Sequence, residues 1–235
     1  LLEDFATCII PEATRVNDDN FWDNASRIVL KIALQKLSKE DQSLETLLKY
    51  TIRDDIKVTE EFFKGTSASA MTCVDADKTA LSIRMNLTTK LACLESLKDG
   101  DFAIRNWIQD DSKKGFLFLA CTPSQRAKLK PLITAWFSLA GKSLLGHRAS
   151  EKVWFFVDEL PSLNRLPDLA QLLAELRKYN GCFVLGLQTI SQLDELYGQN
   201  ISKTICGLTG TKLVFRTPDA NTAKRMSEFL GEQEI

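Results

Sequence analysis

The chain has 235 residues, of which 44% are hydrophobic and 26% are charged, and its formal net charge at pH 7 is −1. This composition is ordinary for a globular protein, and the length suits one large domain or two smaller ones. Because the net charge is so small, any contact with nucleic acid has to come from local basic patches. Six scattered cysteines without a CxxC pair, together with a single histidine, argue against a zinc site.

The first hundred residues have the periodicity of helices. An apolar segment from Phe5 to Ile10 precedes polar residues 17–20, which resemble a loop and a helix N-cap. Helices are predicted over residues 21–37, from 43 onward, over 52–64 and over 67–97. Since no strand pattern occurs between residues 21 and 97, we expect an all-α unit there.

After the polar turn at residues 98–101 the pattern changes to alternating strands and helices. Strands are predicted at 116–120, 153–157, 182–187 and 211–215. Helices are predicted at 124–145, 167–179 and 191–197, with a last one capped by Asp219 and running to Leu230. This alternation is typical of a parallel α/β sheet. We therefore expect an α/β core made of residues 1–20 and 99–235, with residues 21–98 inserted as an all-α domain.

The most informative stretch is the apolar run 153–157, which leads directly into Asp158 and Glu159. Such a run predicts a strand buried on both faces, with the two carboxylates at its C-terminal edge, where open α/β sheets bind ligands. The pattern resembles the Walker B motif of P-loop NTPases. In that motif the Asp holds Mg²⁺ through water and the Glu activates the attacking water. The simpler alternative is that the two acids cap the next helix.

Two further positions are candidates for the same chemistry. Gln188 follows the neighbouring predicted strand and could sense a γ-phosphate and a water, although it could also cap a helix. Arg177, followed by Lys178, ends the helix after the Walker B-like strand. It could act as an arginine finger on the nucleotide of a neighbouring subunit, or the two cations could simply stabilise a helix C-terminus.

The triplet Gly141-Lys142-Ser143 imitates the end of a phosphate-binding P-loop. The complete motif needs a glycine five residues before Gly141, where this chain has Trp136. The triplet also lies inside a predicted amphipathic helix. We therefore exclude it as a Walker A motif.

Several motifs in this order resemble the type IV secretion coupling proteins of bacterial conjugation, which are DNA-transfer ATPases. The resemblance is carried by residues 157–163, 177–181, 186–193 and 197–198, and by 101–107 and 131–136. It covers most of residues 100–235 and is weaker over the helical block, although members of this family carry an all-α domain at that place.

This resemblance implies a RecA-like P-loop NTPase core that assembles as a homo-hexamer on the cytoplasmic side of the inner membrane. ATP and Mg²⁺ would be its cofactors, and its partners would be single-stranded DNA, relaxase and other relaxosome proteins, and the secretion channel. By motif, Asp158 would hold Mg²⁺, Glu159 would activate water, Gln188 would sense the γ-phosphate and Arg177 would reach the next subunit. The Walker A strand and the membrane helices would lie upstream of Leu1, so these 235 residues alone are expected to hydrolyse little or no ATP.

Two other functions fit the sequence. The chain could be a recognition module for DNA or relaxosome proteins, without activity of its own. It could also belong to a general RecA-like DNA translocase unrelated to secretion.

Overall fold

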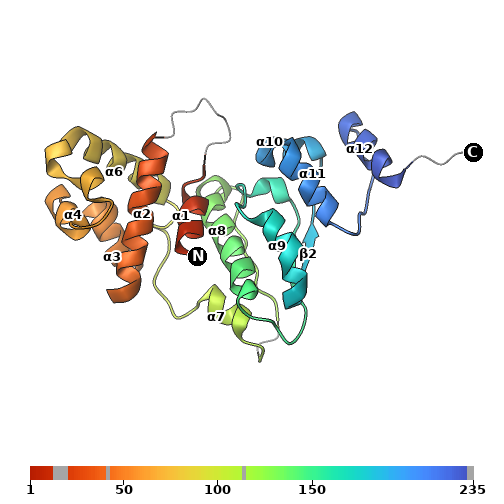
Figure 1. Ribbon diagram of the computed structural model, residues 1–235, viewed down its shortest axis with the longest axis horizontal. Helices are drawn as coiled ribbons and strands as arrows, with labels where there is room; N and C mark the ends of the chain where they lie inside the picture. Colours follow the sequence, from red (N-terminus) through yellow and green to blue (C-terminus); the bar gives the residue numbers. More distant parts are fainter. Residues whose placement is uncertain (13–20, 41–42, 113–114, 232–235) are drawn as a thin grey trace, which may run out of the picture.

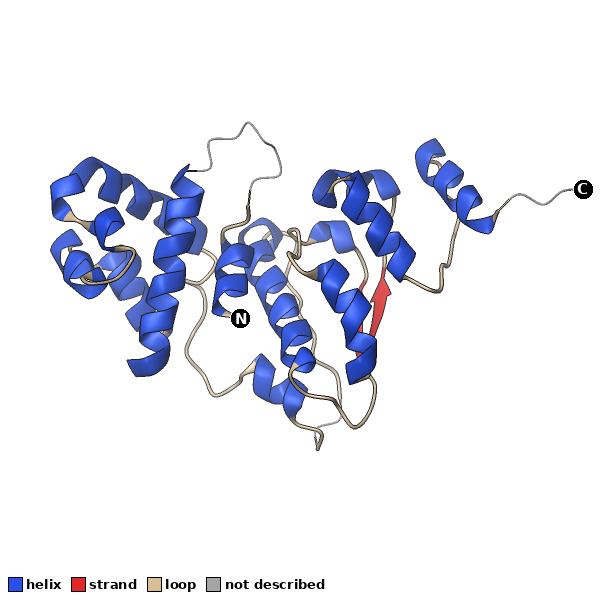
Figure 2. Ribbon diagram, viewed as in Figure 1, coloured by secondary structure: helices blue, strands red, loops and turns tan. Residues whose placement is uncertain are grey.

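The structure is a computed structural model, which describes residues 1–12, 21–40, 43–112 and 115–231. The molecule is elongated (Figure 1), with residues 21–98 at one end, the first residues and 126–145 in the middle, and 190–230 at the other end. Helices dominate, and the sheet consists of two short strands (Figure 2). None of the described helices is long and apolar enough to cross a membrane.

Every regular element described within residues 21–98 is helical. Ser43 begins a helix as predicted, because its Oγ accepts a hydrogen bond from the amide of Thr46 at 3.1 Å. The first predicted helix continues to Glu40, three residues past its expected end, and the polar residues 17–20 lie outside the described residues. The elements are α1 (Leu2–Ile9), α2 (Phe21–Glu40), α3 (Leu44–Leu48), the π-helical turn η1 (Lys49–Arg53), α4 (Ile56–Phe63), α5 (Ser69–Thr72), the 3-10 turn η2 (Val74–Ala76) and α6 (Asp77–Leu91).

The single long helix predicted over residues 67–97 is wrong. The chain forms α5, leaves helical geometry at Cys73 with ψ 136°, and resumes as η2 and α6. Thr72 explains part of the break, because its hydroxyl donates to the carbonyl of Ala68 at 3.2 Å and thereby competes with the helical hydrogen bonds. The apolar periodicity continues across this break, so it could not reveal it.

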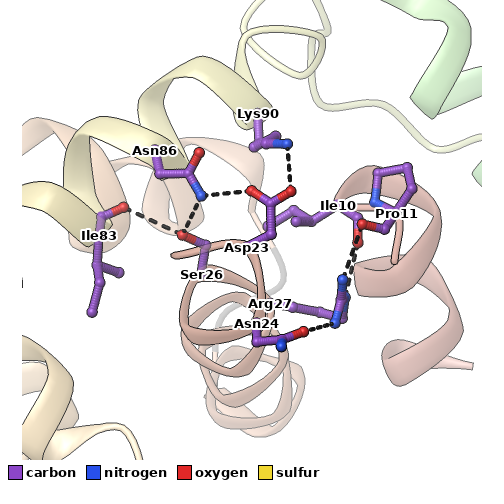
Figure 3. Close-up of polar contacts among 9 residues, drawn as sticks. All are labelled: Ile10, Pro11, Asp23, Asn24, Ser26, Arg27, Ile83, Asn86 and Lys90. Atoms are coloured by element: carbon purple, nitrogen blue, oxygen red, sulfur yellow. Dashed lines mark hydrogen bonds and ion pairs between the residues drawn. The ribbon is translucent and has the colours of Figure 1, made fainter. Parts of the chain in front are cut away.

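Polar contacts join α2 to α6 (Figure 3). Asp23 accepts hydrogen bonds from Asn86 Nδ2 and Lys90 Nζ, both at 2.9 Å. The same Asn86 nitrogen donates to Ser26 Oγ at 3.0 Å, and Ser26 is fully buried. Because the Ser26 hydroxyl and the Asn86 amide hydrogen-bond to each other, the apolar faces of α2 and α6 can pack together without leaving these polar groups unpaired.

Arg27 ties α2 to the end of α1 (Figure 3). Its Nε donates to the carbonyl of Ile10 at 2.8 Å and its Nη2 donates to the carbonyl of Pro11 at 3.0 Å. These carbonyls follow the last turn of α1, where backbone acceptors lack helical partners. The helical part is therefore attached to the N-terminal segment by charge-assisted bonds as well as by packing.

The other half of the chain builds the sheet. It contains α7 (Ile104–Gln109), α8 (Arg126–Leu145), β1 (Val153–Val157), the 3-10 turn η3 (Leu160–Ser162), α9 (Leu169–Glu175), the 3-10 turn η4 (Leu176–Tyr179), β2 (Gly181–Leu185), α10 (Ile190–Tyr197), α11 (Gln199–Leu208) and α12 (Ala220–Leu230). β1 and β2 are parallel, with Val153 opposite Gly181 and Val157 opposite Leu185. Helix α11 has no counterpart in the sequence prediction.

Two predicted strands are not strands in the structure. Residues 116–120 and 211–215 have no regular structure, and the described sheet contains only β1 and β2. Phe116 and Phe215 are each 84% exposed, although Leu119 of the first segment packs against the core beneath the sheet. A strand needs a hydrogen-bonded neighbour, whereas sequence pattern reports only residue preference.

The prediction that β1 is buried on both faces is also wrong. Phe155 and Val157 are buried against helices, but Trp154 is 52% exposed and Phe156 is 65% exposed. Trp154 and Phe156 stack on each other with ring centroids 5.9 Å apart on the open face. Because side chains alternate across a strand, a continuous apolar run does not by itself establish that both faces are covered.

Helix α8 connects the two halves. Its Leu132 and Ala135 join the core formed with α1 and the helical part, whereas Phe137, Ala140 and Leu144 join the core beneath the sheet. Full burial of one such large apolar side chain stabilises the fold by about 1.5–3 kcal/mol. The helix runs through Pro131 without interruption.

Candidate active site at the carboxyl edge of the sheet

Asp158 and Glu159 lie where β1 ends, as predicted. Asp158 is exposed and Glu159 is half-buried. The alternative role as helix caps finds no support, because Glu159 occupies the N-cap position of η3 but makes no side-chain capping hydrogen bond. The two carboxylates are therefore not used by the local backbone.

One oxygen of Glu159 is unsatisfied. Its Oε1 is buried and has no hydrogen-bond partner among the described residues. Buried polar atoms without partners are rare, and each calls for a ligand, a water or a chemical role. Asp158, the residue before it, has an exposed carboxylate. Carboxylate oxygens suit a hydrated Mg²⁺ or a water to be activated.

Gly186 holds the ends of the two strands close together. Its amide donates to the carbonyl of Val157 at 2.7 Å, and its own carbonyl accepts from the amide of Leu160 at 2.8 Å. A Cβ atom at this position would lie 2.0 Å from the carbonyl oxygen of Asp158. Only glycine allows this approach, so the residue sets the spacing between β2 and the backbone of the two acids.

Gln188 follows β2 at the same edge and its side chain is exposed. It does not cap the next helix. That role belongs to Thr189, whose Oγ1 accepts from the amide of Gln192 at 3.3 Å. Since Val157 is opposite Leu185, the chain positions of Asp158, Glu159 and Gln188 all come after the paired ends of parallel strands. The Gln188 amide therefore remains available for a ligand at this edge.

Arg177 lies at the opposite edge. It is exposed in η4, immediately before β2 begins at Gly181. The five residues of β2 separate it from the carboxyl edge by about 16 Å at the usual rise of a strand. Within one chain Arg177 therefore does not join Asp158 and Glu159.

The P-loop-like triplet is part of the packing of α8. A Cβ on Gly141 would lie 2.8 Å from Leu172 Cδ1, so the glycine lets α8 pack closely on α9. Lys142 forms ion pairs with Asp4 at 2.5 Å and with Asp168, which links α8 to α1 and to the N-cap residue of α9. The triplet therefore has a structural role here, in agreement with its exclusion as a Walker A motif.

Tyr197 supports the loop after the acids. It is buried, and its hydroxyl accepts a hydrogen bond from the amide of Leu166 at 3.2 Å. Burial raises the pKa of Tyr197 to about 12, so the phenol stays protonated at neutral pH. The contact fixes the chain that follows η3.

Two sets of contacts in this half of the chain were not predicted from the sequence. One is the ion bridge centred on Lys142, and the other is a group of hydrogen bonds from α12 to the start of α10. Both join residues far apart in the chain. No local pattern signals such pairs, although the motif around Gln188 could have directed attention to the helix that follows it.

Known proteins resemble this chain in sequence and fold. The family of type IV secretion-system coupling protein DNA-binding domains matches residues 2–235. The coupling protein TraD of Escherichia coli (strain K12) is 32% identical over 240 residues, which cover 97% of this chain and 33% of TraD. The chain thus spans about a third of the length of that relative.

Solved structures agree with this match. The plasmid coupling protein TrwB in complex with a non-hydrolysable GTP analogue is 30% identical, with a TM-score of 0.80 over 98% of this chain and 57% of that chain. TrwB in complex with ADP and Mg²⁺ is also 30% identical, with a TM-score of 0.75 over 88% of this chain and 50% of that chain. The fold is that of the RecA-like NTPase core of TrwB. The chain therefore belongs to the family of type IV secretion-system coupling proteins that is defined by this DNA-binding domain.

Proposed function

We propose that the chain is part of a nucleotide-driven motor that transfers single-stranded DNA, with its attached relaxase, into a type IV secretion channel. The observation that carries this proposal is the buried Oε1 of Glu159, which has no hydrogen-bond partner among the described residues, in the residue that follows the exposed Asp158 at the end of β1. The binding of ADP and Mg²⁺ by the relative TrwB supports the same chemistry.

Each residue of the edge then has a role. Asp158 holds a hydrated Mg²⁺, which neutralises charge on the phosphates, and Glu159 orients and deprotonates the attacking water. The side-chain NH2 of Gln188 donates a hydrogen bond to the γ-phosphate, and its carbonyl oxygen accepts one from the water. Arg177 acts on the nucleotide of a neighbouring subunit, since its position at the far edge of its own sheet excludes a role in cis.

The assembly that fits these roles is a homo-hexamer on the cytoplasmic side of the bacterial inner membrane. In it, residues 1–20 and 99–235 belong to the motor core and residues 21–98 form an inserted helical module that meets relaxosome proteins. Residues 1–235 contain no complete Walker A motif, so the P-loop comes from another part of the whole protein. We expect the isolated 235 residues to hydrolyse little or no ATP.

The test is Glu159→Gln in the full-length protein. The amide keeps the size of the side chain but cannot accept the proton of the attacking water, so ATP binding should persist while turnover is lost. Glu195→Gln, an exposed position on α10, is the matched control and should retain wild-type turnover. ATP hydrolysis and nucleotide binding are measured on the same preparations, and normal hydrolysis by Glu159→Gln would refute the assignment.

A further inference from the structure

Helix α12 contacts the first turn of α10, directly after Gln188. Thr222 of α12 accepts a hydrogen bond from the amide of Ile190 at 2.9 Å, and this contact is buried. Asn221 Nδ2 also reaches Ser191 Oγ at 3.3 Å. Ile190 is two residues after Gln188, so these bonds restrain the backbone that directly follows Gln188.

The direction of the hydrogen bonds at Thr222 is determined. The Thr222 hydroxyl has a single proton, and it donates this proton to Asp219 Oδ2 at 2.6 Å. Its lone pairs are then free to accept from the Ile190 amide. Thr222 is only 7% exposed, so water competes poorly for either bond. Asp219, Thr222 and Ile190 therefore form an ordered chain from the cap of α12 to the start of α10.

A second contact lies further along both helices. Arg225 Nη1 is 3.0 Å and 2.7 Å from the two carboxylate oxygens of Asp194 on α10. The side chains are 14% and 15% exposed, so solvent screens this pair less than a surface ion pair. The two contacts together attach α12 to α10 at two positions along their length.

We propose that Thr222 is a positioning residue for Gln188: by holding the Ile190 amide, it fixes the direction in which the Gln188 side chain points at the carboxyl edge of the sheet. This inference rests on the proposed role of Gln188 at the nucleotide. Thr222 does not touch the reacting groups. Its effect passes through the backbone at Thr189 and Ile190, and it couples the position of α12 to the catalytic edge.

The experiment compares Thr222→Val and Thr222→Ser in the full-length protein. Valine has the same shape but cannot accept from the Ile190 amide, whereas serine keeps the hydroxyl. Displacing a positioned group lowers turnover more than binding, so Thr222→Val should lower kcat for ATP about 10- to 100-fold and change KM by less than about twofold. Thr222→Ser should retain kcat within about threefold. Thr204→Val, an exposed threonine of α11, is the matched control and should behave as wild type.

A structural readout accompanies the kinetics. In Thr222→Val the Ile190 amide should exchange with solvent at least about tenfold faster, while amides in β1 keep their protection. If Thr222→Val does not fold, Arg225→Lys offers a second route, because lysine keeps the charge but lacks the planar guanidinium whose Nη1 lies within 3.0 Å of both Asp194 oxygens. It should lower kcat in the same way.

The possible failures are distinguishable. If Glu159→Gln abolishes turnover but Thr222→Val and Arg225→Lys leave kcat unchanged, the positioning role is wrong and the proposed function stands. Loss of kcat in Thr222→Ser equal to that in Thr222→Val would also overturn it, since the hydroxyl would not be the cause. If Glu159→Gln still hydrolyses ATP, the proposed function fails and this inference fails with it.

Discussion

Gly186 has no functional group, yet the geometry of the acidic pair depends on it. Any side chain there meets the backbone carbonyl of Asp158, which cannot move aside as a flexible side chain would. We expect Gly186→Ala to separate β1 from β2 at Asp158 and to destabilise the protein by about 1–3 kcal/mol, the usual cost of overpacking. This corresponds to a decrease in Tm of roughly 2–4 °C per kcal/mol for a chain of this size.

Gly207→Ala is the control for that substitution. Gly207 lies in α11, and nothing is within 4 Å of where its Cβ would be. Alanine has the better helix propensity, so Tm should stay constant or increase. Thermal unfolding followed by circular dichroism compares the two variants. Equal values of Tm for Gly186→Ala and wild type would show that the strands can separate without cost.

At the residue scale the sequence was informative because the acids and Gln188 directly follow strands. Their position depends on where β1 and β2 end. β1 ends at Val157 as predicted, whereas β2 ends at Leu185, two residues before its predicted end, which still leaves Gln188 beyond the strand. The contact between Thr222 and Ile190 could not be predicted in this way, because 32 residues separate them in the chain. Such a pair becomes visible only when two helices are packed against each other.

At the scale of elements, the helices were predicted better than the strands. A helix satisfies its hydrogen bonds within its own segment, so periodicity and caps such as Ser43 and Asp219 located most helices. They did not reveal the break at Cys73 or the helix α11. Residues 116–120 and 211–215 have apolar composition typical of strands but no paired neighbour. Whether such a segment becomes a strand depends on what lies beside it, which its own residues do not encode.

Lys142 of α8 links α1, through Asp4, to Asp168 at the start of α9. Burial alone would raise the pKa of Asp4, but the hydrogen bonds and charges of Lys142 and of the Leu1 amino group together outweigh it and hold that pKa below its ordinary value. Burial alone would lower the pKa of Lys142, but the hydrogen bonds to Asp168 and Asp4 outweigh it and raise that pKa. We expect Lys142→Met to destabilise the protein by about 2–3 kcal/mol, less than for a fully buried pair because these groups are partly exposed.

The pH dependence of this effect has a definite sign. The contribution of Asp4 is present above its unfolded pKa and is lost as the pH falls through its lower folded pKa. The contribution of Lys142 is present below its unfolded pKa and is lost as the pH rises through its higher folded pKa. The difference in Tm between wild type and Lys142→Met should therefore be largest near neutral pH and shrink at both extremes. Lys178→Met, at an exposed lysine, should show no such profile.

At the scale of the whole molecule, the sheet half exposes large apolar side chains on segments that no described element covers. Phe118 is 81% exposed, Phe215 is 84% exposed and Phe156 on β1 is 65% exposed. Isolated apolar residues on a surface are ordinary, but a strand with an open apolar face and free edges favours association with other chains. We expect the isolated 235 residues to self-associate at micromolar concentrations, with the open face of β1 and these two segments as the contact surface.

Phe118→Lys combined with Phe215→Lys tests this expectation. Because both side chains are largely exposed, they contribute little to folding, and Tm should change by no more than about 2 °C. Two cations on the contact surface should repel a second copy, so the variant should sediment as a monomer at concentrations where the wild type forms larger species. Met85→Lys, at a position 72% exposed on α6 and away from the sheet, separates this effect from a general gain in charge. If Met85→Lys suppresses association equally well, or if the wild type is monomeric throughout, the open sheet is not the surface through which copies meet.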